Sequence, residues 1–223
     1  MELVNAPVAE LKALLTQSFE EWAVEGRSCA LSGDATALLF LPALRVANVN
    51  WSRITLFWTD EHAVPADDPE SNFGIAERML LSPLGAKVAR AIRMPADMPR
   101  LEDAAAKYDA TLATELSGDP LDLAILGVGE DGHVASIFPG QVSNGEAVVV
   151  AVEDAPRPPR RRLTLTMEFL LQTKKIWIVA VGARKLPALH AALSKKQRST
   201  PLDLLLQQAK DVTVFTDQVI RRS

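Results

Sequence analysis

The sequence predicts an α/β fold, in which helices flank both faces of a mostly parallel, Rossmann-like sheet. Short apolar runs rich in branched residues alternate with helical patterns, as in chains built from crossover connections. Most of these runs lack polar alternation, which suits strands that are buried on both faces of a parallel sheet. The expected strands are 28–31, 54–58, 121–126, 147–152, 176–181 and 212–215.

Helical patterns separate the expected strands. In segment 7–23, the apolar residues Leu11, Leu15 and Phe19 recur every four residues, so a helix there has one apolar side. Three further segments are expected to be helical: 101–116, 186–193 and 202–209.

Length and composition indicate one domain over residues 1–223. Of the 223 residues, 48% are hydrophobic and 23% are charged, which is enough apolar material for a substantial core. The net charge of -4 argues against a general nucleic-acid-binding face, but a few local cations can still attract a small anionic substrate.

The single cysteine and the N-terminal segment point to a reducing compartment. Cys29 cannot form a disulfide within the chain, and we expect it in the core. The N-terminus shows no signal-peptide pattern, and no apolar run approaches the roughly 20 residues of a membrane span. We therefore expect a cytoplasmic protein with no membrane partner.

A glycine-rich loop follows the expected strand 121–126. Its sequence GVGEDG, residues 127–132, fits the G-x-G-x-x-G spacing of a dinucleotide-binding turn. However, Phe138, Pro139 and Gly140 stop any helix after barely two turns, so no long crossover helix is available to bind a pyrophosphate. The dinucleotide interpretation is therefore the weaker alternative.

The same loop can instead present a catalytic base. Open α/β sheets place their sites at the carboxyl ends of strands, where glycines allow tight turns. Asp131 and His133 lie in this turn. A histidine can take a proton from water, and a nearby carboxylate can orient its ring.

Four segments in order resemble the 6-phosphogluconolactonases. LDLAILGVGEDGHVASIFPG (121–140) is similar to their D-L-x-L-L-G-x-G-x-D-G-H-T-A-S-L-F-P signature. LSGDATALL (31–39) resembles their S-G-G-x-T-P loop, and segment 57–81 resembles their W-x-D-E-R segment. Segment 162–185 resembles their R-x-T-L-T segment, which ends in G-x-x-K.

The resemblance implies a fold and an activity. The fold would be similar to that of glucosamine-6-phosphate deaminase, ribose-5-phosphate isomerase and CoA-transferase. The reaction would be hydrolysis of 6-phospho-D-glucono-1,5-lactone to 6-phosphogluconate, in the oxidative pentose phosphate pathway. His133 would be the general base, with Asp131 orienting it, and backbone N–H groups of a glycine turn would stabilise the oxyanion. We expect no cofactor, and a monomer or a weak homodimer.

A metal is not expected either. His62, His133 and His190 lie far apart, without the spacing of metal ligands.

The resemblance also implies a phosphate site. It assigns Ser32, Gly33, Thr36, Arg162 and Lys185 to phosphate binding. The first two end a strand just before a helical segment, and a helix N-terminus suits an anion. An arginine can bind phosphate through two N–H groups.

Asp60 completes the expected substrate-binding site, and three polar residues near it in the sequence have other possible roles. Asp60 and Glu61 follow a strand and could bind sugar hydroxyls or hold a loop. Ser71 and Asn72 are more typical of a helix cap than of a substrate contact.

Three positions bear on the choice among related activities. Asp34 and His62 depart from the resembled pattern, which has glycine and arginine there. These departures leave open a related lactonase or isomerase with a shifted substrate, or a catalytically weakened sugar-phosphate-binding relative. Isomerising relatives typically carry a glutamate where this chain has Phe138, and that difference favours the lactonase.

Overall fold

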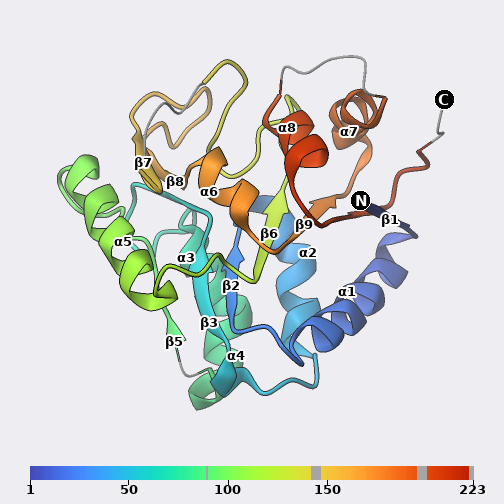
Figure 1. Ribbon diagram of the computed structural model, residues 1–223, viewed down its shortest axis with the longest axis horizontal. Helices are drawn as coiled ribbons and strands as arrows, with labels where there is room; N and C mark the ends of the chain where they lie inside the picture. The colour runs from blue at the N-terminus through green and yellow to red at the C-terminus, as the bar shows by residue number, and fades with distance from the viewer. Residues whose placement is uncertain (89, 142–146, 195–199, 221–223) are drawn as a thin grey trace.

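The computed structural model describes residues 1–88, 90–141, 147–194 and 200–220. Its main element is a seven-stranded sheet in which every paired neighbour runs parallel (Figure 1). In spatial order its strands are β1 (Glu2–Asn5), β10 (Val212–Thr216), β9 (Lys175–Ala180), β6 (Leu123–Gly127), β2 (Ser28–Leu31), β3 (Thr55–Trp58) and β5 (Arg90–Ala91). The predicted parallel α/β fold is therefore confirmed.

A second, antiparallel sheet consists of three short strands, in the order β4 (Asp60–His62), β8 (Arg162–Leu165) and β7 (Val149–Val152). The strand expected at 147–152 exists, but it belongs to this sheet and not to the parallel one. Its apolar run reflects its contact with helix α5 and not a place in the main sheet. The expected strands did not include β1, β4, β5 or β8, each of which has only two to four residues.

Helices cover the sheet, and Figure 1 shows α5 beside β7 and β8 on one flank and α1 on the opposite flank. The α-helices are α1 (Val8–Trp22), α2 (Asp34–Arg45), α3 (Asn72–Ala76), α4 (Ser82–Leu84), α5 (Leu101–Leu116), α6 (Met167–Gln172), α7 (Leu186–Leu193) and α8 (Pro201–Gln208). Short turns of 3₁₀-helix are η1 (Trp51–Arg53), η3 (Gly85–Lys87) and η4 (Ala183–Lys185), and η2 (Glu77–Leu81) is a π-helical turn.

Local signals explain where several helices begin and end. Thr200 caps α8 and forms a capping box with Asp203, and Pro201 occupies the first turn. Helix α5 has acidic residues in its first turn and ends at Ser117 in a left-handed conformation. Helix α1 buries the three residues predicted from their spacing, Leu11, Leu15 and Phe19.

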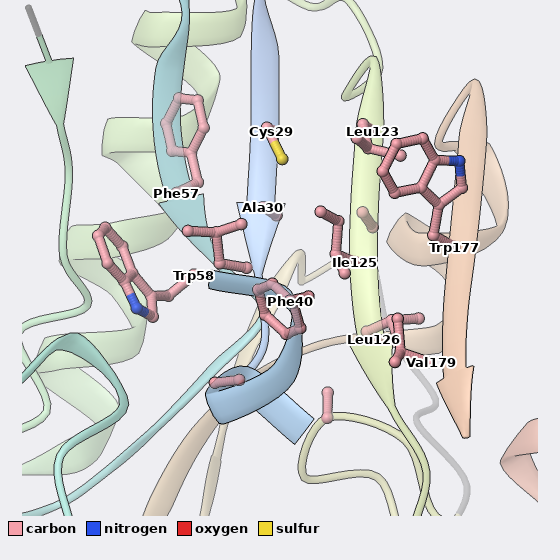
Figure 2. Close-up of a cluster of buried hydrophobic side chains, with 14 of the residues drawn as sticks. Cys29, Ala30, Phe40, Phe57, Trp58, Leu123, Ile125, Leu126, Trp177 and Val179 are labelled. Carbon is pink, nitrogen blue, oxygen red and sulfur yellow. The ribbon is translucent and has the colours of Figure 1, made fainter. Parts of the chain in front are cut away.

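The core lies between the central strands and the helices above them. Figure 2 shows Cys29 and Ala30 of β2 between Phe57 of β3 and Leu123 of β6. All are buried, and each large apolar side chain there contributes on the order of 1.5–3 kcal/mol. Cys29 is a buried free thiol, as predicted.

Three neighbouring strands of the sheet end at the same edge. Ser32 follows β2, the glycine loop follows β6, and η4 follows β9. Because these strands are parallel, their carboxyl ends bring residues far apart in sequence into one site.

Candidate active site

A cavity of about 670 Å³ lies at this edge of the sheet. The N-terminus of α2, the end of β4, the glycine loop, the proline-rich loop before β8 and η4 all contribute to its wall. Cationic side chains are prominent in the lining: Arg78, Arg157, Arg162, Arg184 and Lys185. Its volume and its charge suit a small anionic molecule.

The N-terminus of α2 opens into this cavity. Ser32, Gly33 and Thr36 all line it, so the structure brings together the loop predicted from the sequence. A β-carbon on Gly33 would fall 1.8 Å from Oδ1 of Asn72, so only glycine fits against that side chain. Helix α2 begins at Asp34, whose side chain lies outside the described residues.

The glycine loop holds His133 against Asp131. Nδ1 of His133 lies 2.5 Å from Oδ1 of Asp131, which also accepts the backbone N–H of His133 at 3.2 Å. A β-carbon on Gly129 would fall 2.0 Å from Nδ1, so a glycine lets the pair lie against the backbone. Gly132 has φ +82°, which favours glycine for the turn itself.

The two partners differ in exposure. The side chain of His133 is 15% exposed and lines the cavity, while that of Asp131 is 41% exposed and is not part of the cavity lining. Burial alone would raise the pKa of Asp131, but the charge of His133 and the hydrogen bonds from His133 outweigh it and hold the pKa below its ordinary value. The carboxylate form is therefore the stable partner for the ring.

Phe138 closes the other side of His133. The two ring centroids lie 4.8 Å apart, and Cζ of Arg162 lies 5.7 Å from the centroid of the phenyl ring. No helix follows the glycine loop in the described stretch 133–141, where Val134 and Ile137 form an isolated bridge instead. The loop therefore lacks the helix that a dinucleotide pyrophosphate needs.

Arg162 lines the cavity but is also anchored to the protein. Its Nε donates to the carbonyl of Pro159 at 2.8 Å, and its Nη2 donates to the carbonyl of Arg157 at 3.0 Å. Nη1 lies 3.4 Å from Oγ of Ser136. Arg162 is 5% exposed, so it fastens the proline-rich loop to β8 as well as facing the cavity.

Asp60 is buried and is not among the described residues that line the cavity. Its Oδ2 accepts from Oγ of Ser136 at 2.8 Å, and its Oδ1 accepts from Oγ1 of Thr59 at 3.1 Å. The carboxylate thus supports the residues that surround Arg162 and does not form the cavity surface.

Glu61 holds the start of α3. Its carboxylate accepts the backbone N–H groups of His62, Asn72 and Phe73, each at 2.8 Å, and the hydroxyl of Ser71 at 3.1 Å. Burial raises the pKa of Glu61 and these backbone hydrogen bonds oppose the rise. Glu61 was expected either to bind sugar hydroxyls or to hold a loop. The structure shows the second role, because its carboxylate holds the N-terminus of α3.

The helix-cap prediction for Ser71 is confirmed, because its hydroxyl accepts from the backbone N–H of Gly74 at 3.0 Å.

His62 has a defined place in the cavity wall. It is 5% exposed, and its Nδ1 lies 2.7 Å from the backbone carbonyl oxygen of Glu70. In β4 it pairs with Arg162 of β8. Sequence reasoning left the role of His62 open, since only long-range contacts show that it is buried.

Arg78, Arg157 and Arg184 also line the cavity, although the sequence motifs did not assign them to the site. Arg184 pairs with Glu130 of the glycine loop, with Nε 3.4 Å from Oε1. The sequence feature that could have indicated a role for Arg184 is its position next to Lys185, which the resemblance assigns to phosphate binding.

Among residues 1–88, 90–141, 147–194 and 200–220, no three His, Cys, Asp or Glu side chains form a group that could hold a metal ion. Likewise, no described helix combines the length and apolar character that a membrane crossing requires.

The chain is similar to several known proteins. It is 38% identical over 188 residues to "Probable 6-phosphogluconolactonase 3, chloroplastic" of rice (Oryza sativa subsp. indica), a match that covers 76% of this chain and 57% of the rice protein. It is 33% identical over 229 residues to the 6-phosphogluconolactonase of Rattus norvegicus, covering 98% and 89% of the two chains. The chain thus spans little more than half the length of the rice relative.

Solved structures share the fold over nearly the whole chain. The 6-phosphogluconolactonase of Thermotoga maritima superposes with a TM-score of 0.80 at 28% identity, covering 96% of each chain. A monomeric glucosamine-6-phosphate deaminase superposes with a TM-score of 0.79 at 20% identity, covering 98% of each chain, and this likeness concerns the fold alone.

A family model described as glucosamine-6-phosphate isomerases/6-phosphogluconolactonase matches residues 2–215. This match and the relatives agree with the resemblance of the four motifs, and the chain belongs to that family.

Proposed function

We propose that this protein hydrolyses 6-phospho-D-glucono-1,5-lactone to 6-phosphogluconate. The observation that carries the proposal is the Asp131–His133 pair beside a cation-lined cavity. The names of the relatives point to the same substrate.

The phosphate of the substrate would bind at the N-terminus of α2. Backbone N–H groups and the helix dipole favour an anion there, next to Ser32, Gly33 and Thr36. Lys185 approaches from the end of β9, and Arg162 also lines the cavity. These cations would offset the charge of the phosphate.

The chemistry follows from the state of His133. A carboxylate only accepts hydrogen bonds, so Nδ1 of His133 carries the proton and Nε2 carries a lone pair. Nε2 takes a proton from water, and the water oxygen bonds to the lactone carbonyl carbon. Backbone N–H groups of a glycine turn stabilise the oxyanion. The ring C–O bond then breaks, and His133 returns the proton to the leaving oxygen.

Phe138 favours this reaction over isomerisation. An isomerase must move protons between carbons and open a sugar ring, for which relatives use a glutamate at this position. The phenyl ring here is 3% exposed and packs against His133, so it supplies no acid or base. Lactone hydrolysis needs only one activated water.

We further propose that residues 1–223 form one catalytic domain. It would act in the cytoplasm without metal or cofactor, as a monomer or a weak homodimer.

The test is hydrolysis of freshly prepared lactone in EDTA, with the product coupled to 6-phosphogluconate dehydrogenase. We expect His133→Ala to lower the rate about a hundredfold or more, as loss of a general base predicts. His190→Ala is the matched control, because His190 is exposed on α7, away from the cavity. A wild-type rate equal to spontaneous opening would refute the proposal.

A further inference from the structure

We propose that Nε2 of His62 accepts a hydrogen bond from a hydroxyl group of the bound sugar phosphate, and so contributes to substrate specificity. This inference rests on the proposed function, because it concerns the same cavity. The resembled family pattern has an arginine at this position, which can only donate hydrogen bonds.

The position of His62 is fixed by its surroundings. Its backbone N–H donates to Oε1 of Glu61 at 2.8 Å, and β4 is paired with β8 through Arg162. The side chain is 5% exposed and forms part of the cavity wall. A ligand in the cavity therefore meets a ring that has already been ordered.

The hydrogen bond at Nδ1 determines the tautomer of the ring. A backbone carbonyl oxygen can only accept, so the 2.7 Å contact with Glu70 places the proton on Nδ1 of His62. In the neutral imidazole, Nε2 then has a lone pair and no hydrogen. In that form the remaining polar atom of His62 is a hydrogen-bond acceptor.

Nε2 is buried and has no hydrogen-bond partner among the described residues. Buried polar atoms in folded proteins nearly always have a partner, and leaving one unpaired is costly. Since Nδ1 is already bonded to Glu70 and His62 lines the cavity, a group entering the cavity is the natural partner for Nε2.

The chemistry of an acceptor selects the group that binds. Phosphate oxygens are acceptors near neutral pH and cannot pair with a lone pair, whereas a sugar hydroxyl can donate its hydrogen. His62 therefore recognises the sugar part of the ligand, and the N-terminus of α2 with Lys185 is left to the phosphate.

Two substitutions separate this role from a structural one. In His62→Asn the amide nitrogen lies near the position of Nδ1, so the bond to Glu70 can be kept while the Nε2 acceptor is lost. In His62→Gln the amide reaches the position of Nε2 and can supply an acceptor there. Binding of 6-phosphogluconate and of inorganic phosphate is measured by calorimetry for the wild type and both variants.

We expect His62→Asn to weaken 6-phosphogluconate binding about three- to tenfold, as the loss of one hydrogen bond predicts. Binding of inorganic phosphate should be unchanged, and His62→Gln should bind both ligands nearly as the wild type does. The inference is wrong if His62→Asn binds 6-phosphogluconate like the wild type. It is also wrong if both variants lose affinity for both ligands equally, because that pattern indicates damage to the fold.

Binding and turnover also separate this inference from the proposed reaction. If the wild type does not hydrolyse the lactone but the predicted binding pattern appears, the reaction is refuted and the hydroxyl contact is supported. If turnover is normal and His62→Asn binds 6-phosphogluconate normally, only the hydroxyl contact is refuted.

Discussion

Nδ1 of His133 lies 2.5 Å from Oδ1 of Asp131, and that oxygen also accepts the backbone N–H of His133 at 3.2 Å. One carboxylate oxygen thus fixes both the tautomer of the ring and its orientation. The two residues are only two positions apart, so the glycine turn creates the pair locally.

Replacing Asp131 with asparagine tests the tautomer directly. The amide N–H of Asp131→Asn can face Nδ1, which moves the ring proton to Nε2 and removes the base. We expect kcat to fall about a hundredfold or more, with little change in KM. The coupled assay measures both constants.

The control is Glu130→Gln, which alters the neighbouring carboxylate that pairs with Arg184 and leaves the His133 contact intact. Wild-type kcat in Asp131→Asn would show that this contact does not position a catalytic base.

Adding a methyl group at Gly129 should displace His133 without changing any charge. The new β-carbon would fall 2.0 Å from Nδ1 of His133, so the ring must move. We expect kcat of Gly129→Ala to fall by about two orders of magnitude, the effect expected of a displacement near 1 Å. Steady-state kinetics and circular dichroism would separate this effect from misfolding.

Gly127→Ala provides the comparison, because its β-carbon would fall 2.9 Å from Oγ1 of Thr36 at the N-terminus of α2. We expect this variant to raise KM more than it lowers kcat. If Gly129→Ala turned over at the wild-type rate, His133 would not need its observed position.

The lowered pKa of Asp131 predicts a pH-dependent contribution to stability. Burial raises this pKa, but the charge and hydrogen bonds of His133 bring it below the ordinary value of 3.8. The contribution is therefore complete above about pH 4 and is lost as the pH falls through the lowered pKa. We expect the stability gap between the wild type and Asp131→Asn to shrink below about pH 4, as measured by urea unfolding across a pH series. A gap that widened on acidification would contradict the prediction.

Glu61→Gln should destabilise the protein. Three backbone N–H groups and the hydroxyl of Ser71 converge on this carboxylate, and an amide would turn its own N–H groups toward some of these donors. We expect the free energy of unfolding to fall by about 1–3 kcal/mol.

Glu77→Gln is the matched control, since Glu77 makes an exposed bond to Ser82 and should change stability by less than about 0.5 kcal/mol. Equal unfolding midpoints for Glu61→Gln and the wild type would show that the N-terminus of α3 does not depend on the charge of Glu61.

Patterns that are local in the sequence predicted much of this protein. The apolar runs located β2, β3, β6, β9 and β10, because a strand buried on both faces is apolar at most of its positions. The spacing of Leu11, Leu15 and Phe19 located α1. The glycines around Asp131 and His133 predicted a tight turn that brings a carboxylate to an imidazole, since both partners lie in one turn.

Only the tertiary structure decided the roles that depend on distant partners. In the sequence, His62 cannot be distinguished from other polar residues at strand ends. The structure shows that its Nδ1 contacts the carbonyl oxygen of Glu70 and that His62 lines the cavity. The sequence allowed Glu61 to bind a sugar hydroxyl. In the structure, α3 packs against it, and its carboxylate accepts backbone N–H groups at the start of that helix. Apolar periodicity records which side of an element is buried, but it carries no information about which polar atom a buried side chain meets. That choice is made when segments far apart in the chain pack together.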